Sequence, residues 1–284
     1  MADGTAVHSS YHWRKAGKTA GPREFLRARE SYYVAASTRF LHGNEVQVWS
    51  LGNKEGNLGA LLLSHNRIFF PVFSGQADIP LPLFMKRVLR KIPIHLLQGL
   101  RSDAEALEAA IAPWGYEPAQ RIEYDLMALD REPNPALLTT GPAGLMLRQP
   151  RSADMDGLFR LQAAYEQEEV LPWKAEFNPA VCRMSLEQLV AHESMLVAEL
   201  DSRLVGKINT TGASFSRYQI GGVYVDPPYR GLGIASRMSA VFLQGLLSEG
   251  KGITLFVKKQ NPAACRMYRH IGFAVLGDYR LSYF

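Results

Sequence analysis

The stretch Gly222–Leu247, with the sequence GVYVDPPYRGLGIASRMSAVFLQGLL, decides the fold of this chain. It opens with an apolar run typical of a β-strand, which stops at Pro227 and Pro228 because proline has no N–H group for the hydrogen bonds of a sheet. A glycine-rich turn follows, and the residues from Ser236 onward have the apolar spacing of a helix. The order strand, turn, helix is therefore expected.

The turn contains Gly231 and Gly233, which carry no Cβ atom that would cover the backbone N–H groups. Free N–H groups at the start of a helix, together with the positive end of the helix dipole, attract an anion such as pyrophosphate. Arg230 adds a cationic, fork-shaped side chain beside them. The alternative is a tight turn that uses glycine for its geometry alone, and a short Gly-x-Gly pattern does not exclude it.

The residues around this turn resemble the acyl-CoA-binding signature of the GNAT N-acyltransferase superfamily. That signature, Arg/Gln-x-x-Gly-x-Gly/Ala, is filled by Arg230, Gly233 and Ala235. A second block, Leu255–Phe273, is similar to the family's pattern of a strand, an asparagine, a short helix with a tyrosine, and Gly-Phe. The resemblance covers roughly Gly144–Phe284 and implies an acyl-CoA-binding domain there.

The resemblance implies that acetyl-CoA is the acyl donor, and no metal is expected. In the family, the strand before the turn separates from its neighbour and pairs its backbone with the pantetheine arm, a place that Val223–Val225 occupy here. A backbone N–H in this strand would donate a hydrogen bond to the thioester oxygen as negative charge develops. The implied contacts with acetyl-CoA are Val223, Tyr224, Val225, Arg230, Gly231, Leu232, Gly233, Ile234, Ala235 and Asn261.

Tyr268 is the candidate general acid, because the family often keeps a tyrosine at this place with its hydroxyl facing the cofactor sulfur. An unperturbed tyrosine is protonated at pH 7, as an acid must be. The alternative is a core tyrosine, since Ala264, Tyr268 and Ile271 share one face of the expected helix.

The general base is expected away from the strand Tyr218–Val225, which carries no glutamate. Glu168 and Glu169 lie near the end of the first helix of the second half, where the family forms its acceptor site. They are the candidates for binding a cationic amine or taking its proton through water. The alternative is a solvated acidic helix end. Glu199, on an expected strand, is another candidate base if its side chain faces the pocket.

Polar residues mark where several helices are expected to begin. Ser102 is expected to cap Asp103–Ile111, and Ser152 is expected to cap the helix from Ala153 to about Gln167. Asn178 is expected to open the helix after that.

A weak internal repeat divides the chain into two halves. A helix end, a Gly followed by an aromatic residue, and then a strand occur at Gly115–Leu129 and again at Gly272–Phe284. The first half has the order β-β-β-α-β-α-β, which matches the later part of a GNAT domain. We therefore expect an α/β protein with a mixed sheet and two tandem GNAT-like domains, at 1–132 and 145–284, joined by the Pro- and Gly-rich linker 133–144.

The first half lacks the glycine-rich phosphate turn. Its counterpart, Ser74–Pro82, contains Pro80 and Pro82, which have no N–H group, and Asp78, which repels phosphate. The first domain is therefore expected to be a degenerate GNAT-like domain that binds no CoA, packs on the catalytic domain and shapes the acceptor pocket.

Composition sets the class of protein and its compartment. The 284 residues are 47% hydrophobic and 21% charged, which suits two globular domains. No apolar run reaches the length of a membrane span and Met1–His8 lacks the features of a signal peptide, so neither a membrane partner nor export is expected. Cys182 and Cys265 are too few for a disulfide framework, which favours a cytoplasmic setting. A net charge of +5, spread over both halves, does not favour nucleic acid as a partner.

These observations favour an N-acetyltransferase that moves the acetyl group of acetyl-CoA directly to a primary amine of a small molecule or peptide. A covalent enzyme intermediate is disfavoured, because Cys265 has no evident histidine partner. Three alternatives stay open: a longer acyl group, transfer to a protein N-terminus, and a non-catalytic acyl-CoA sensor or interaction protein. The repeat is compatible with a monomer as well as with a homodimer.

Overall fold

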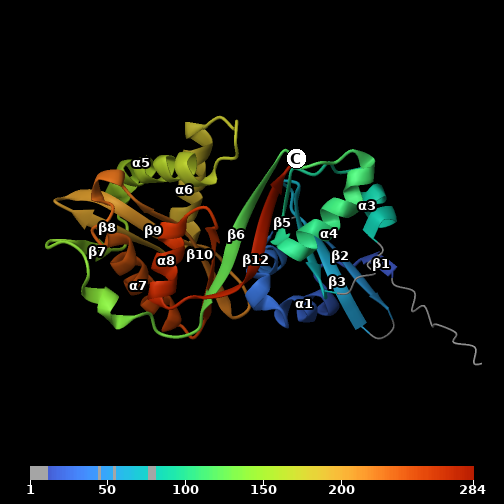
Figure 1. Cartoon of the computed structure of the whole chain (residues 1–284), viewed down its shortest axis with the longest axis horizontal. Coiled ribbons are helices and arrows are strands. Elements are labelled where there is room, and N and C mark those ends of the chain that lie inside the picture. Colours follow the sequence, from blue (N-terminus) through green and yellow to red (C-terminus); the bar gives the residue numbers. More distant parts are fainter. Residues whose placement is uncertain (1–11, 44–45, 54–55, 76–80) are drawn as a thin grey trace, which may run out of the picture. The chain divides into compact units, whose positions relative to one another are not determined.

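The computed structural model describes residues 12–43, 46–53, 56–75 and 81–284. The chain divides into two compact units. Unit 1 is the described part of Met1–Ile122 together with Tyr279–Phe284, and unit 2 is Glu123–Asp278. Figure 1 shows the elements of both units along the chain. Asp78 and Pro80, expected to disfavour phosphate, lie outside the described residues, as does Met1–His8.

Unit 1 is a mixed sheet in the strand order β1-β2-β3-β4-β5-β12, with helices on both faces. Strands β4 and β5 run parallel, and the other neighbours are antiparallel. The strands are β1 (His12–Lys15), β2 (Gln47–Asn53), β3 (Gly56–Leu63), β4 (Ile68–Phe73), β5 (Leu96–Leu100) and β12 (Ala274–Tyr283). The helices are α1 (Ala20–Arg27), α2 (Val34–His42), α3 (Leu81–Leu89) and α4 (Arg101–Ile111).

The apolar run at the end of β3 explains why both faces of this sheet are covered. Leu61 and Leu63 belong to one buried core with α3 and α4. Leu62, between them, is equally buried but points to the other face, where α1 and α2 contact the strand. A strand that is apolar on both sides needs helices on both sides.

Unit 2 is a mixed sheet in the order β6-β11-β10-β9-β8-β7, in which β10 and β11 run parallel. Its strands are β6 (Gln120–Leu129, of which Tyr124–Leu129 pair with β11), β7 (Met146–Arg148), β8 (Met195–Leu200), β9 (Arg203–Ala213), β10 (Arg217–Val225) and β11 (Gly252–Lys258). Its helices are α5 (Met155–Tyr165), α6 (Pro179–His192), α7 (Ile234–Leu247) and α8 (Pro262–Ile271).

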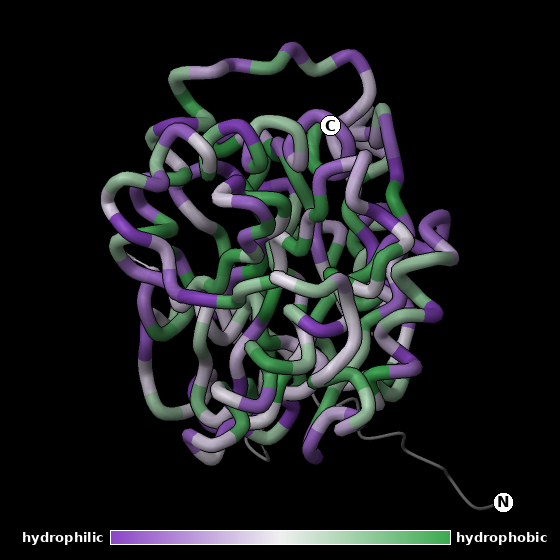
Figure 2. The backbone as a smooth tube through the Cα atoms, turned by 90° about the vertical axis from the view of Figure 1, so that its left-hand side faces the viewer, coloured by the Kyte–Doolittle hydropathy of each residue, from purple (hydrophilic) through white to green (hydrophobic). Residues whose placement is uncertain are grey.

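Two apolar cores fill the two faces of this second sheet. One packs α7 and α8 against the sheet and includes Met238, Leu243 and Ile271. The other packs α5 and α6 against the opposite face and includes Leu158 and Leu186. In Figure 2 many outer turns are purple, while many stretches further inside are green and apolar. Among the helices of the described ranges, none is both long and apolar enough to cross a bilayer.

Two strands are assigned differently from the expected division at 1–132, 133–144 and 145–284. Tyr124–Leu129 of β6 pair with β11 and belong to unit 2. Tyr279–Tyr283 of β12 pair with β5 and belong to unit 1. Each unit therefore contains a strand from the far side of its expected boundary.

Two of the three expected helix caps are wrong. Helix α4 begins at Arg101, so Ser102 lies inside it and caps nothing. A 3₁₀ turn, Ser152–Asp154, precedes α5, and the carboxylate of Asp154 accepts the Arg151 N–H at 2.6 Å. The third prediction is confirmed: Asn178 Oδ1 accepts hydrogen bonds from the first N–H groups of α6 at 3.0 and 3.1 Å.

Candidate functional site

The two central strands of unit 2 separate in the middle of the sheet. Strands β10 and β11 are paired from Arg217↔Gly252 to Ile220↔Leu255. Beyond that point Gly221–Val225 and Phe256–Lys258 continue without pairing to each other. Strands that part in this way present backbone N–H and C=O groups to which an extended ligand can bind. We call this opening the splay.

A bulge in β10 lies at the beginning of the splay. Gly221 pairs with Asn209 of β9 and the next paired residue, Tyr224, pairs with Lys207, so Gly222 and Val223 lie opposite one residue of β9. The backbone of Gly222 has φ +60°, and a Cβ there would lie 2.7 Å from Lys207 Nζ. Only glycine fits this position without strain.

Lys207 lies beneath this bulge and is completely buried, on the α5 and α6 side of the sheet. Its Nζ donates hydrogen bonds to the Gly222 carbonyl oxygen at 3.0 Å and to Asn209 Oδ1 at 3.2 Å. Burial lowers the pKa of Lys207 to about 7. The sequence reading missed this residue, although a lysine within the apolar run Leu204–Ile208 was a visible signal.

The glycine turn has the expected backbone geometry. Pro227–Tyr229 form a 3₁₀ turn, and Gly231 and Gly233 have φ values of +78° and +79°. Gly233 precedes α7 as its N-cap, and a Cβ there would meet the Gly141 nitrogen at 3.3 Å. The N–H groups of the first turn of a helix have no partner within the helix, so the turn suits a phosphate group.

The Arg230 side chain already has hydrogen-bond partners within unit 2. Its Nη1 and Nη2 donate to the two carboxylate oxygens of Glu168 at 2.8 and 2.7 Å, and its Nε donates to the Val225 carbonyl at 2.9 Å. The guanidinium also lies 5.2 Å from the centre of the Tyr224 ring. Hydrogen bonding to Arg230 lowers the pKa of Glu168, so that carboxylate is held as an anion.

Glu168 and Glu169 lie in a π-helical segment, Glu166–Val170, that follows α5. Glu168 is tied to the β10 side of the splay through Arg230. Glu169 is tied to the β11 side, because it forms an ion pair with Lys258 Nζ at 3.3 Å and accepts a hydrogen bond from Asn261 Nδ2 at 3.2 Å. The segment therefore places one carboxylate on each of the two separating strands. Such π-helical turns often occur at functional sites.

Tyr268 lies on α8 with only 7% of its surface exposed. Its ring packs edge-on against Phe273, with 5.6 Å between ring centres. Burial raises the pKa of Tyr268, and the neighbouring Tyr165 and Glu169 raise it further. Its hydroxyl is therefore protonated at neutral pH.

The remaining sequence candidates have other partners or are buried. Glu199 accepts from Arg148 Nε at 2.7 Å, which occupies the side chain proposed as an alternative base. Cys182 and Cys265 are free and buried. Burial raises the pKa of Cys182 to about 11 and also raises that of Cys265, so neither thiol is a ready nucleophile. Within the described ranges no cluster of His, Cys, Asp and Glu could hold a metal ion.

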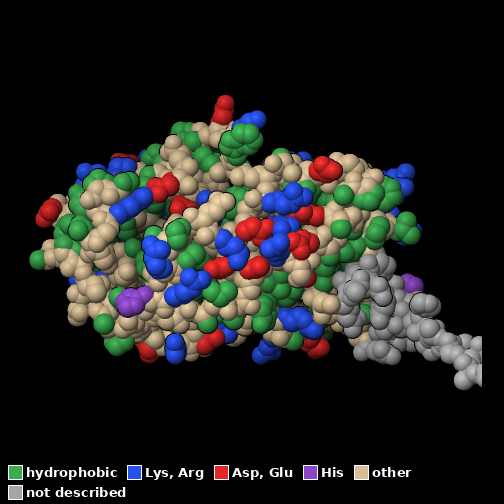
Figure 3. Space-filling view, in the orientation of Figure 1, with side chains coloured by type: hydrophobic (Ala, Val, Ile, Leu, Met, Phe, Trp, Pro, Cys, Tyr) green, Lys and Arg blue, Asp and Glu red, His purple; other side chains and the backbone are tan. Residues whose placement is uncertain are grey.

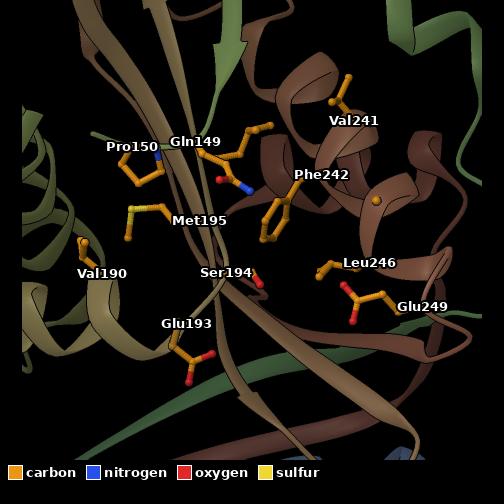
Figure 4. A pocket seen from close by; sticks show the side chains of 12 residues that line it. Gln149, Pro150, Val190, Glu193, Ser194, Met195, Val241, Phe242, Leu246 and Glu249 are labelled. Carbon is orange, nitrogen blue, oxygen red and sulfur yellow. The ribbon is translucent and has the colours of Figure 1, made fainter. Parts of the chain in front are cut away.

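A hollow of about 520 Å³ lies elsewhere in unit 2, beside the start of β8 and the C-terminal half of α7 (Figure 4). Its lining includes Phe242, Met195, Glu193 and Glu249. Glu193 accepts from the Thr210 hydroxyl and Glu249 from Tyr218, so both carboxylates already have donors. None of the residues expected to bind acetyl-CoA or to catalyse lines it.

Unit 1 contains a counterpart of the splay that is filled by its own side chains. Strands β4 and β5 pair only at Ile68↔Leu96 and Phe69↔Leu97. Beyond these pairs, Pro71 lies so close to Gly99 that a Cβ on the glycine would be 3.2 Å from the proline ring. The buried Asp103 carboxylate accepts from the Phe73 N–H at 3.1 Å and from the Tyr33 hydroxyl at 2.6 Å.

Charged side chains of both signs are mixed on the face of the molecule seen in Figure 3. In unit 2, for example, Lys259 forms ion pairs with Asp125 at 2.8 Å and with Asp278 at 2.6 Å.

Part of the second unit matches a known family. Residues 158–273 match the model of the acetyltransferase (GNAT) family. A mycothiol acetyltransferase of Brachybacterium faecium is 36% identical over 108 residues, which are 34% of this chain and 33% of that protein. An uncharacterised protein of Mycobacterium leprae is 24% identical over 187 residues, which are 65% of this chain and 48% of that protein. The chain thus covers less than half of either relative.

Two solved structures resemble the chain over almost its whole length. A GCN5-related N-acetyltransferase from Sphaerobacter thermophilus has a TM-score of 0.63 at 15% identity, with 96% of this chain and 94% of that chain covered. A tandem GNAT protein from the clavulanic acid biosynthesis pathway has a TM-score of 0.61 at 13% identity, with 96% and 98% covered. The expected α/β fold with two tandem GNAT-like domains is confirmed.

Proposed function

We propose that the GNAT-type domain at residues 158–273 is an acetyl-CoA-dependent N-acetyltransferase that moves the acetyl group directly to a primary amine. The observation that carries this proposal is the splay between β10 and β11, which leads straight into the glycine turn at the start of α7. An opening lined by strand backbone, next to an anion site at a helix N-terminus, suits a ligand with an extended arm and a pyrophosphate.

The residues present fit acetyl-CoA. Gly231–Ala235 would hold the pyrophosphate through backbone N–H groups, since the positive φ values leave the turn without side chains above Gly231 and Gly233. The backbone of Val223–Val225, which is unpaired on its β11 side, would hold the pantetheine arm, and Asn261 would contact it from the β11 side. In this arrangement the Val223 N–H is the donor to the thioester oxygen, where negative charge develops.

The two glutamates of the π-helical segment receive different roles. Glu168 is paired bidentately with Arg230 and has a lowered pKa, which favours a role in orienting Arg230 and attracting a cationic amine. The Glu169 side chain is 27% exposed and can reach water, so we assign it the removal of the amine proton through a water molecule.

Tyr268 is assigned the return of a proton to the departing thiolate. Its raised pKa keeps the hydroxyl protonated, so that it can donate a hydrogen bond, and finally the proton, to the sulfur as negative charge develops there. The partly exposed Glu169 would thus take the proton from the amine, and the buried Tyr268 would give a proton to the thiolate. The free cysteines take no part in this scheme.

Unit 1 is proposed to bind no CoA, because Pro71, Gly99 and the Asp103–Tyr33 pair fill the counterpart of the splay. We place the enzyme in the cytoplasm, as a monomer or homodimer that needs no metal. Its acceptor is proposed to be a small molecule or peptide with a primary amine. Amines related to mycothiol are the first to screen, because of the relative from Brachybacterium faecium.

Calorimetric titration with acetyl-CoA tests the donor site. The wild-type chain should bind one acetyl-CoA, and Gly233→Val should bind none, because its side chain would crowd Gly141 and Thr140. Gly245→Val, on the same helix but with open space around its Cβ position, is the matched control and should bind normally. A folded wild type that binds no acetyl-CoA would overturn the proposal.

An amine screen with a thiol-release assay then tests transfer. Turnover that is lost in Tyr268→Phe while binding is kept supports the enzyme. Tight binding of acetyl-CoA without turnover of any small amine or peptide would favour the non-catalytic sensor instead, and turnover only with longer acyl-CoA or with protein N-termini would favour those alternatives.

A further inference from the structure

Lys207 is a buried lysine at the centre of the unit 2 sheet, with 0% of its surface exposed. Among the residues that the structure describes, no carboxylate lies within ion-pair distance of it. A buried amine of this kind costs stability compared with an apolar side chain of the same size. A role beyond packing is therefore indicated.

The partners of Lys207 match the donors of an ammonium group. Two N–H bonds have oxygen acceptors, at Gly222 and Asn209. The third can point at the ring of Tyr165, whose centre lies 4.9 Å from Nζ. Burial favours the neutral amine, while the nearby Glu166 and Cys182 favour the cation, so this group can change charge near neutral pH.

The link from Lys207 to the reaction runs through one peptide group. The Gly222 carbonyl that accepts from Lys207 and the Val223 N–H belong to the same peptide unit. Both residues lie in the bulge, between the paired residues Gly221 and Tyr224 and beyond the last pair with β11. A hydrogen bond to the carbonyl oxygen polarises such a unit and makes its N–H a stronger donor.

The other end of Gly222 is held as well. Its N–H is hydrogen-bonded to the Tyr165 hydroxyl, a contact that lowers the pKa of that tyrosine against the larger effect of burial. Lys207 and Tyr165 are thus both hydrogen-bonded to the bulge from the α5 and α6 side of the sheet, and they contact each other.

We propose that Lys207 is a positioning residue for acetyl transfer, which fixes and polarises the Gly222–Val223 peptide group through its hydrogen bond to the Gly222 carbonyl. This inference rests on the proposed function, in which the Val223 N–H donates to the thioester oxygen. No bond to Lys207 forms or breaks, and it keeps contact with protein atoms only.

A substrate-free measurement tests the link itself. In the wild type, the amide ¹H–¹⁵N signal of Val223 should shift with a midpoint near pH 7 as Lys207 changes charge. Other titratable groups face Lys207: Glu166 of the π-helical segment, Cys182 of α6, and the Tyr165 and Tyr224 rings. The shift must therefore disappear in Lys207→Met and persist in Glu166→Gln. A Val223 titration that survives in Lys207→Met would overturn the proposal.

Activity gives the second test. Lys207→Met should lower kcat by about 10- to 100-fold, less than the loss of a whole oxyanion donor, and leave KM for acetyl-CoA within about threefold. Lys207→Gln keeps a neutral N–H donor and should recover part of kcat without restoring the Val223 titration. Lys251→Met removes a lysine that packs over Tyr218, and it serves as the control with unchanged kcat.

The outcomes separate this inference from the function on which it rests. If Lys207→Met melts at a much lower temperature than the wild type, the folded variant Lys207→Gln takes its place in both tests. The inference is overturned if Lys207→Gln has the kcat and KM of the wild type and its Val223 signal still titrates. A wild type that neither binds acetyl-CoA nor acetylates an amine overturns the proposed function, whatever the Val223 signal does.

Discussion

Arg230 and Glu168, 62 positions apart in the sequence, form a bidentate ion pair with hydrogen bonds of 2.8 and 2.7 Å. The pair joins the first residue of the glycine-turn signature to the π-helical segment after α5. Both side chains are 42% exposed, so the pair adds little to the stability of the fold. Its effect should be felt in ligand binding.

Removal of the Glu168 charge should strengthen acetyl-CoA binding. In Glu168→Gln the positive charge of Arg230 is no longer neutralised, so Kd for the anionic ligand should fall by about two- to fivefold at low salt. Calorimetry at two salt concentrations checks this, with the gain shrinking at high salt. Unchanged affinity at low salt would show that Arg230 does not contribute to the anion site.

Substitution by alanine should have opposite effects on stability at two glycines that both have open space at the Cβ position. A Cβ on Gly231 or Gly245 meets nothing within 4 Å, but Gly231 has φ +78° whereas Gly245 lies in α7. Gly231→Ala should cost about 1–2 kcal/mol of unfolding free energy, and Gly245→Ala should add about 1 kcal/mol. Denaturant unfolding measures both. Equal effects would mean that the turn does not hold Gly231 in its left-handed conformation.

The carboxyl group of Asp103 should make unit 1 less stable as the pH rises. Burial raises its pKa from 3.8 to about 6, so the folded protein binds this proton more tightly than the unfolded chain does. The stabilisation is present below pH 3.8 and is lost as pH rises to about 6. At 1.36 kcal/mol per pKa unit the loss is about 3 kcal/mol.

Asp103→Asn isolates this effect. The amide oxygen can still accept from Phe73 and Tyr33, but the side chain does not titrate. The difference in unfolding free energy between variant and wild type should grow between pH 4 and pH 6, in favour of the variant. A difference that stays constant over this range would contradict the raised pKa.

Loss of the Tyr268 hydroxyl should reduce turnover without loss of binding. Tyr268→Phe keeps the ring and its contact with Phe273, so we expect kcat to fall by about 100-fold or more, with Kd for acetyl-CoA within about twofold. Tyr279→Phe is the control, because Tyr279 is also buried but belongs to unit 1. If both variants keep full turnover, Tyr268 is a core residue and not the acid.

The parts of the site that depend on local chemistry could be predicted from the sequence. Pro227 and the glycines of the turn act through their own backbone restrictions, and Asn178 caps the helix that follows it directly. Such effects need no knowledge of distant residues. The order of elements along the chain from β2 to β6 was also predictable, because each strand carries its own apolar pattern and is bounded by turn residues. The strand β1 and the helices α1 and α2, which all precede β2, were not expected.

What could not be predicted depends on residues that meet only in the folded chain. Lys207 is an ordinary strand residue until Gly222 and Tyr165 surround it. In the sequence, Glu168 and Glu169 have the pattern of the end of one helix. No neighbouring residue indicates that their side chains bind to residues beside two different strands. The Ser102 cap was wrong because α4 begins directly after Leu100, so that Ser102 lies inside its first turn.

The strands that β6 and β12 contribute across the expected boundary make unit 1 discontinuous in the sequence, because unit 2 is inserted between its two segments. A chain cut within residues 133–144 would give two fragments, and each would carry a strand that completes the sheet of the other. Neither fragment is a transferable module. A chimaera that replaces unit 2 by that of a relative must therefore exchange Glu123–Asp278 as one insertion and leave Tyr279–Phe284 with the host.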